Sequence, residues 1–345
     1  MSQVEKEIHE QPEVLERLLR DGRDTVEDIA GHVRASAPRF VVIAARGSSD
    51  NTARYAPYLF GAHNRLSVSL ATPSLFTYYE AAPSLAGALV IGVSQSGQSP
   101  DIVAVVESGR RQGALTLAIT NQPDSPLALA AEHTLPLLAG EERAVAATKT
   151  YTSQLCALAM LSAALEGGES RREELTRVPV LVERAIGLNT ALDDKVARYR
   201  YAEHFVVVGR GFNYATAFEV ALKMKETSYV LAEPYSPADL LHGPVAMIDR
   251  GFPVLLVASS GRVLDDLEHL MGLLERRSGE LIAISDDPGV LGRARAALPL
   301  PPGVPEWLSP MVAVVPGQLW AVALARTRGL DPDEPRGLSK VTETR

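Results

Sequence analysis

Short apolar runs alternate with longer amphipathic segments along most of the chain. Residues 88–93 form an apolar run, which is typical of a strand buried on both faces. Residues 101–112 and 264–277 instead place apolar side chains at helical spacing. Strands that alternate with helices form parallel sheets covered by helices on both faces. The pattern therefore predicts an α/β fold.

The alternating pattern occurs twice. Residues 40–47 read FVVIAARG and residues 205–211 read FVVVGRG, so their final glycines are 164 residues apart (211 − 47 = 164). Residues 117–123 (LAITNQP) are echoed by residues 282–288 (IAISDDP) at an offset of 165 (282 − 117 = 165). Matched strand ends at nearly constant spacing predict a tandem duplication of one α/β domain.

The domain boundaries that we expect follow this repeat. A helical segment is predicted at 1–30, a first domain at 31–165 and a second domain at 166–330. The last segment, 331–345, has no apolar periodicity, which is typical of an extended and often disordered terminus. Ligands of doubly wound sheets bind beyond the carboxyl ends of the strands, so polar loops that follow strands are the first places to look for a site.

One such loop, residues 94–99 (SQSGQS), follows an apolar strand and precedes a helix. The free N–H groups and the dipole at a helix N-terminus favour an anion, and three hydroxyls with Gly97 suit a phosphate. The loop has no Lys and is therefore not a nucleotide-binding P-loop. Taken alone, it could be a phosphate site or an ordinary polar turn. The matching loop 258–263 (ASSGRV) has two serines, and only the first loop keeps the full set of hydroxyls, so we expect one phosphate-binding loop per chain.

Composition excludes several classes of protein. With 34 basic and 42 acidic residues, the net charge of −8 argues against a nucleic-acid partner. The single cysteine, Cys156, allows no internal disulfide. We find no apolar run of membrane-spanning length and no signal-peptide pattern, so a cytoplasmic protein is expected. No set of His, Asp and Glu shows ligand spacing, and residues 209–211 lack the rest of a dinucleotide fingerprint. The sequence therefore predicts no metal and no cofactor.

Six motifs in order resemble the sugar isomerase (SIS) family, most closely the isomerase half of glutamine-dependent glucosamine-6-phosphate synthase. The resemblance runs essentially from end to end. It implies two SIS domains, each a three-layer αβα sandwich around a parallel, flavodoxin-like sheet. The motifs are residues 6–12 (KEIHEQP), 94–99 (SQSGQS), 145–149 (VAATK), 221–226 (ALKMKE), 241–244 (LHGP) and 335–340 (PRGLSK).

The resemblance also implies three catalytic residues. Glu226 would move a proton between C1 and C2 of a sugar phosphate, as general acid–base catalysis requires. His242 would open the sugar ring and would reach the site of a neighbouring subunit, which implies a homodimer. Lys340 would close over the sugar and engage its carbonyl group. The further substrate contacts carried over are Ser49, Ser94, Gln95, Ser96, Ser99, Val145, Lys223, Glu219 and Ser339, although Glu219 could instead only position Lys223.

The activity that we expect is conversion of glucosamine 6-phosphate to fructose 6-phosphate and ammonia, by a phosphosugar isomerase or deaminase. The synthase begins with a glutaminase domain and its N-terminal cysteine, whereas residue 2 here is Ser. The ending, residues 340–345 (KVTETR), is closer to that of stand-alone enzymes. Three alternatives stay open: a deglycase or isomerase for another amino-sugar or fructosamine phosphate, an ammonia-dependent synthase isomerase, and a non-catalytic sugar-phosphate sensor.

Overall fold

A computed structural model describes residues 1–340 of the chain, which divide into two compact units. Each unit is assembled from segments that are distant in the sequence. The first unit contains residues 13–143, 149–177 and 339–340, and the second unit contains residues 1–12, 144–148 and 178–338.

Each unit is built on a five-stranded sheet whose paired strands are all parallel. The strand orders are β2-β1-β3-β4-β5 and β7-β6-β8-β9-β10, so both sheets follow one topology and the predicted duplication is confirmed. The first sheet contains β1 (Phe40–Ala44), β2 (Ser67–Leu70), β3 (Ala88–Ser94), β4 (Leu115–Thr120) and β5 (His133–Pro136). The second contains β6 (His204–Val208), β7 (Leu231–Tyr235), β8 (Pro253–Val257), β9 (Glu280–Ser285) and β10 (Ala296–Pro299).

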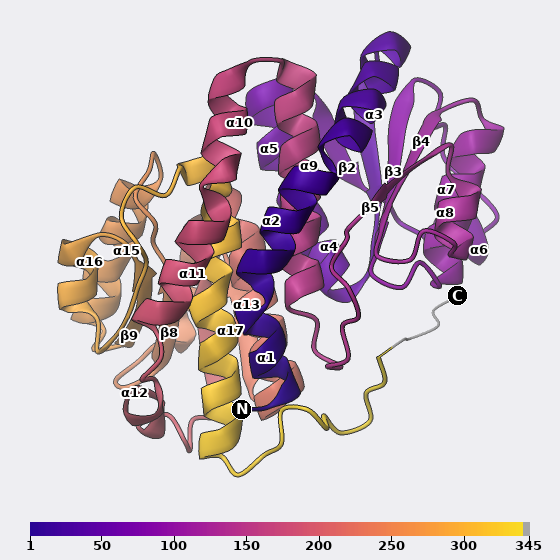
Figure 1. Cartoon of the computed structure of the whole chain (residues 1–345). Helices are drawn as coiled ribbons and strands as arrows, with labels where there is room; N and C mark the ends of the chain where they lie inside the picture. The colour runs from indigo at the N-terminus through magenta and orange to yellow at the C-terminus, as the bar shows by residue number, and fades with distance from the viewer. Residues whose placement is uncertain (341–345) are drawn as a thin grey trace. The chain divides into compact units, whose positions relative to one another are not determined.

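Helices flank both sheets, as the α/β pattern predicts. In the first unit, α6, α7 and α8 gather on one side of the sheet, whereas α3, α4 and α9 contact it elsewhere (Figure 1). The helices that lie mainly in this unit are α2 (Gln11–Asp21), α3 (Arg23–Ser36), α4 (Gly47–Ala53), α5 (Ala56–Asn64), α6 (Ser74–Thr77), α7 (Pro100–Arg111), α8 (Pro126–Ala130), α9 (Lys149–Glu166) and α10 (Glu169–Thr176). The second unit contains α1 (Gln3–His9), α11 (Val178–Leu188), α12 (Asp193–Ala197), α13 (Tyr214–Ser228), α14 (Pro237–Leu241), α15 (Leu264–Arg276), α16 (Pro288–Arg293), α17 (Ser309–Thr327) and the 3₁₀ turns η1 (Gly211–Asn213), η2 (Pro244–Met247) and η3 (Glu306–Leu308).

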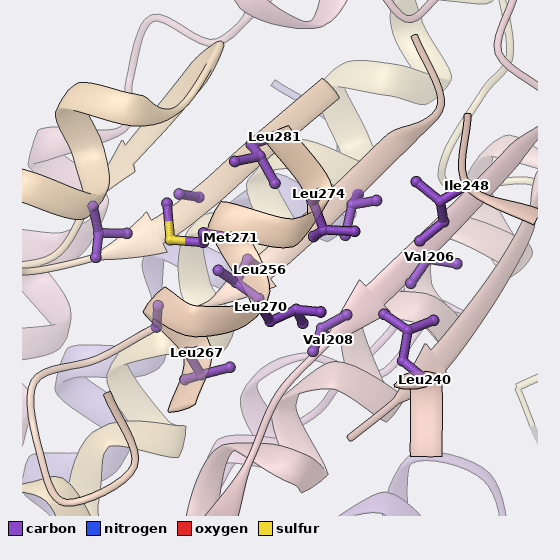
Figure 2. Packing of buried hydrophobic residues seen from close by; sticks show 14 residues of the cluster. Val206, Val208, Leu240, Ile248, Leu256, Leu267, Leu270, Met271, Leu274 and Leu281 are labelled. Carbon is purple, nitrogen blue, oxygen red and sulfur yellow. The ribbon is translucent and has the colours of Figure 1, made fainter. Parts of the chain in front are cut away.

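The helix α15 shows how the sequence pattern produces this packing. Its buried residues Leu267, Leu270, Met271 and Leu274 recur at helical spacing, so they form one stripe. Figure 2 shows this stripe packed against apolar side chains of the neighbouring strands, among them Leu256. Burial of such side chains is the main favourable term in the folding of the unit.

The helix α17 lies in the core of the second unit. Its residues 309–325 are all buried, and the helical stretch Glu306–Thr327 is long and apolar enough to cross a membrane. The expectation that the chain has no apolar run of membrane-spanning length is therefore wrong for these residues. Because 94% of the most apolar part of this stretch is buried within the protein, we interpret it as a core helix.

The segment 331–340 has fixed contacts, contrary to the disorder that its composition suggests. The carboxylate of Asp333 accepts hydrogen bonds from the backbone N–H groups of Gln3 (2.6 Å) and Val4 (2.9 Å), which caps α1. The backbone N–H of Arg336 donates to the hydroxyl of Tyr229 at 2.8 Å. Of the ending predicted to match stand-alone enzymes (residues 340–345), residues 341–345 lie outside the described residues.

Candidate functional site

The serine loop of the first unit connects β3 to α7 through a tight turn. The N–H of Gly97 donates to Ser94 Oγ (3.0 Å), and the N–H of Gln98 donates to Ser96 Oγ (3.3 Å). Gly97 has a φ of +64°, and a Cβ at this position would lie 2.1 Å from Ser125 Oγ. Only glycine fits both the conformation and the space. The loop therefore has a fixed shape, with its hydroxyls gathered at the carboxyl end of β3.

The loop is held to the neighbouring strand and opens toward solvent. The carbonyl of Gln95 accepts a hydrogen bond from the N–H of Asn121 at 3.2 Å. Ser94 is buried, whereas Gln95, Ser96 and Ser99 are half-buried. Ser99 is the N-cap residue of α7, a helix of 12 residues whose N-terminal N–H groups favour an anion. The arrangement can accept a phosphate without a lysine.

An ion pair that the sequence analysis missed lies beside the loop. Asp101, in the first turn of α7, is fully buried and accepts Arg46 Nε at 2.8 Å and Nη2 at 2.7 Å. The second unit repeats this pair as Arg210 and Asp266, 2.9 Å apart. The two aspartates are 165 residues apart in the chain (266 − 101 = 165). The spacing of the repeat could have identified the pair.

Ser49, predicted to contact substrate, lies in α4, which contacts β3. Its hydroxyl oxygen accepts Gln154 Nε2 at 2.9 Å, and Gln154 Oε1 accepts Thr52 Oγ1 at 3.1 Å. Because Ser49 Oγ acts as an acceptor here, its own hydrogen can be donated to a ligand.

Lys340 is held by a carboxylate that the sequence analysis did not identify. Lys340 Nζ donates to Glu142 Oε2 at 2.7 Å. The Glu142 side chain has no exposed area, and it also accepts Thr150 N at 3.0 Å and Thr150 Oγ1 at 2.7 Å. The hydrogen bonds from Thr150 fix the Glu142 carboxylate independently of Lys340, so this carboxylate can set the position of the lysine ammonium group. Ser339, next to Lys340, is exposed.

The corresponding loop of the second unit is occupied by carboxylates. The N–H of Ser260 donates to Asp286 Oδ1 at 2.7 Å, and the N–H of Arg262 donates to Glu306 Oε1 at 3.0 Å. A Cβ on Gly261 would lie 2.4 Å from Glu306 Cδ, so this carboxylate packs directly on the loop. The negative groups take the place that an anion would need. Of the two loops, the serine loop is the one suited to phosphate.

Three predicted residues meet on one helix of the second unit. Lys223 on α13 is 2% exposed, and its Nζ lies 2.5 Å from Glu226 Oε2 and 3.4 Å from Glu219 Oε1. Burial by itself would lower the pKa of Lys223, but the charges of Glu219 and Glu226 outweigh it and hold that pKa above its ordinary value. Glu219 is fully buried, whereas the Glu226 side chain is 22% exposed. Glu226 is therefore the carboxylate of this trio that a ligand can reach.

His242 and Val145 lie on other segments of the second unit. His242 is exposed, forms the C-cap of α14 and precedes Gly243, whose φ is +142°. Among the described residues, no hydrogen bond or ion pair connects it to the α13 trio. Val145 is half-buried and follows Ala144, whose N–H donates to the buried Glu7 at 3.3 Å.

Comparison with known proteins places these features in a family. The profile of the SIS domain matches residues 35–164 and 199–327. Glutamine–fructose-6-phosphate aminotransferase of Thermococcus kodakarensis is 36% identical over 97% of the chain, which spans 57% of that relative's length. A solved structure of a candidate phosphosugar isomerase from Silicibacter pomeroyi is 34% identical, with a TM-score of 0.88, and covers 96% of this chain and 100% of that one. The C-terminal domain of glucosamine-fructose-6-phosphate aminotransferase from Francisella tularensis is 29% identical, with a TM-score of 0.89, over 97% of this chain and 98% of that one. The chain belongs to the SIS domain family.

Proposed function

We propose that the protein is a phosphosugar isomerase that acts as a deaminase on glucosamine 6-phosphate. The observation that carries the proposal is the trio on α13, in which a buried lysine lies between two carboxylates and one carboxylate is accessible. A sensor would need a phosphate-binding loop but no buried acid–base trio, so the trio favours an enzyme. Relatives at 36% and 29% identity are named as enzymes that act on fructose 6-phosphate.

In the proposed reaction, the serine loop binds the phosphate and Glu226 moves the proton. His242 protonates the ring oxygen and opens the ring to the aldehyde. Glu226 then removes the proton from C2 and returns it to C1, which converts the 2-amino aldose to the C2 imine of the ketose. Water adds to C2 and ammonia leaves, so glucosamine 6-phosphate and water give fructose 6-phosphate and ammonia. Lys340, fixed by Glu142, supplies a positive charge near the carbonyl oxygen.

Lys223 has a separate part in this scheme. Because its pKa is held above the ordinary value, it remains an ammonium ion at neutral pH. The ammonium group lies 2.5 Å from Glu226 Oε2 and so fixes the carboxylate that accepts the proton in this scheme. Lys223 therefore positions the base, and Glu219, 3.4 Å away, compensates its charge on the other side.

The test measures ammonia and fructose 6-phosphate released from glucosamine 6-phosphate by the full chain without glutamine. Equal amounts of both products support the proposal. Glu226→Gln should lower turnover by roughly 10²–10⁴-fold with substrate binding retained. The matched control is Glu183→Gln on the exposed face of α11, which should leave turnover unchanged. Wild-type turnover in Glu226→Gln would refute the assignment.

The same assay separates the alternatives. Formation of glucosamine 6-phosphate from fructose 6-phosphate and ammonium with a higher kcat than the release of ammonia would indicate an ammonia-dependent synthase isomerase. Turnover of a fructosamine 6-phosphate instead would indicate a deglycase. Thermal stabilisation by glucosamine 6-phosphate without turnover of any of these sugars would leave the sensor.

We further propose that the protein acts as a cytoplasmic homodimer in which His242 serves the neighbouring subunit. His242 is exposed, and Leu241 and Met247 beside it are apolar side chains that are 40% and 41% exposed. A second copy of the chain would cover these apolar groups and receive the imidazole.

Co-expressing Glu226→Gln with His242→Ala tests this arrangement. If His242 acts in the partner's site, each mixed dimer has one intact site, and random pairing restores about a quarter of wild-type turnover. If His242 acts within its own subunit, every site carries one of the two changes and the mixture stays inactive.

The domain boundaries at 30, 165 and 330 also stay a prediction, which limited proteolysis would check.

A further inference from the structure

A histidine from an edge strand and two residues of a helix meet on the surface of the first unit. Asp28 and His32 lie on α3, and His133 is the first residue of β5. Each residue offers one ligand atom, and these atoms all lie within 4.8 Å of one another. Among residues 1–340, this is the one group of three His, Cys, Asp or Glu side chains that gathers closely enough to hold an ion.

The backbone places these side chains in a way that suits shared coordination. Asp28 and His32 are four residues apart on α3 and therefore project from one face, with Asp28 Oδ2 3.8 Å from His32 Nε2. The rings of His32 and His133 have centroids 4.4 Å apart and planes tilted by 32°. The opposite face of α3 is anchored in the core by Val26 and Ile29. The helix is thus fixed while its outer side chains remain accessible.

The distances are compatible with a tetrahedral ion after small side-chain movements. Imidazole nitrogen and carboxylate oxygen bind Zn²⁺ at about 2.0–2.2 Å, so neighbouring ligand atoms approach to roughly 3.3 Å. The present separations exceed this by about 1–1.5 Å at most. Asp28 and His32 are exposed, so rotation about their side-chain bonds meets little resistance.

We propose that Asp28, His32 and His133 form a binding site for a divalent first-row transition metal ion such as Zn²⁺ or Ni²⁺. Two imidazoles and one carboxylate are a donor set that such ions prefer, with water in the remaining position. Ca²⁺ and Mg²⁺ require more oxygen ligands and are excluded by this donor set. The ion would join α3 to β5, the edge strand of the first sheet. The sequence predicted no metal because the third ligand is 101 residues from His32 (133 − 32 = 101).

The test titrates the chelator-treated full chain with ZnCl₂, NiCl₂ and MgCl₂. Bound metal is measured by calorimetry, and the melting temperature is followed in parallel. We expect one Zn²⁺ or Ni²⁺ per chain and a rise in melting temperature of several degrees at saturating metal, because the ion binds the folded state. MgCl₂ should give neither effect.

Single variants establish which residues hold the ion. His32→Ala and His133→Ala should each weaken binding at least tenfold and abolish the thermal shift, and Asp28→Asn should weaken binding less. The matched control is His269→Ala, an exposed histidine on α15 of the second unit, which should bind as the wild type does. Absence of binding in the wild type, or equal losses in His269→Ala and His133→Ala, would overturn the proposal. The site is independent of the proposed reaction, so either can fail without the other.

Discussion

Replacing Lys223 with methionine tests the trio on α13 without any assumption about substrate. Methionine keeps the length and apolar stem of the lysine but removes the ammonium group that neutralises Glu219 and Glu226. Glu219 has no exposed side-chain area, so its charge would stay buried without the ammonium group that now compensates it. Removing one partner of a buried ion pair costs about 3–5 kcal/mol of folding free energy. Lys225→Met removes a half-buried lysine from the same helix and should cost less than about 1 kcal/mol.

Tryptophan fluorescence during urea denaturation is the appropriate assay. Both tryptophans of the chain, Trp307 and Trp320, belong to the second unit, so the signal reports unfolding of the unit that contains Lys223. Combining Lys223→Met with Glu219→Gln and Glu226→Gln should recover most of the stability.

Lys223 also contributes to the pH dependence of the free energy of unfolding of the wild type, and the sign of its contribution follows from its raised pKa. Its folded-state pKa is raised above the unfolded value, so its contribution to stability is fully present below the ordinary lysine pKa. That contribution is lost as the pH rises through the folded-state value, and it is constant between pH 6 and 9. A loss of stability in Lys223→Met no larger than that in Lys225→Met would refute the reasoning.

Three further predictions concern single residues. Gly97→Ala should lower affinity for glucosamine 6-phosphate at least tenfold in calorimetry, whereas Gly113→Ala, also at positive φ but with open space around it, should not change binding. Burial raises the pKa of Cys156 to about 12, so iodoacetamide at pH 8.5 should alkylate it only after denaturation, and stability should fall between pH 9 and 12 as the unfolded thiol ionises. Gly317→Ala would place a Cβ 2.3 Å from a side chain of α13 and should lower the free energy of unfolding by about 1–3 kcal/mol, whereas Gly187→Ala on α11 has open space and should be neutral or stabilising.

The fold could be predicted from the sequence because its signals are local and repeated. Apolar runs such as residues 88–93 identify strands by themselves. Similar motifs recur 164–165 residues later in the chain, so the strand ends that carry them are each indicated twice. The same applies to the serine loop, whose hydroxyls, glycine and following helix are consecutive in the chain. Interactions across the chain behave differently. The ion pair between Lys340 and Glu142 joins residues 198 positions apart, and no local pattern indicates that Glu142 is buried.

The roles of single residues also divide into those that local spacing predicts and those that depend on packing. The spacing of Glu219, Lys223 and Glu226 on one helix allowed an ion pair to be foreseen. That Lys223 is 2% exposed, and therefore forced to keep its partners, follows only from packing of α13 against β7 and α17. Helix α17 gives the opposite lesson. Its apolar composition suits a membrane or a core equally well, and only its burial against other elements distinguishes the two.

The two related loops show how a duplicated fold can suit an anion in one copy and not in the other. Both loops follow the third strand of a sheet with the same topology, and both lie near an Arg–Asp pair. In the first unit, the turn around Gly97 is supported by neutral hydroxyls, which leave its helix N-terminus able to attract an anion. In the second unit, the carboxylates of Asp286 and Glu306 accept hydrogen bonds from backbone N–H groups of the corresponding loop. A carboxylate of the chain itself accepts the hydrogen bonds that a bound anion would accept. That loop therefore contributes to the stability of the fold and has no free N–H groups at Ser260 and Arg262 for a phosphate. The duplication thus supplies two copies of the same loop, and the choice between hydroxyl and carboxylate at a few positions decides which copy is able to accept an anion.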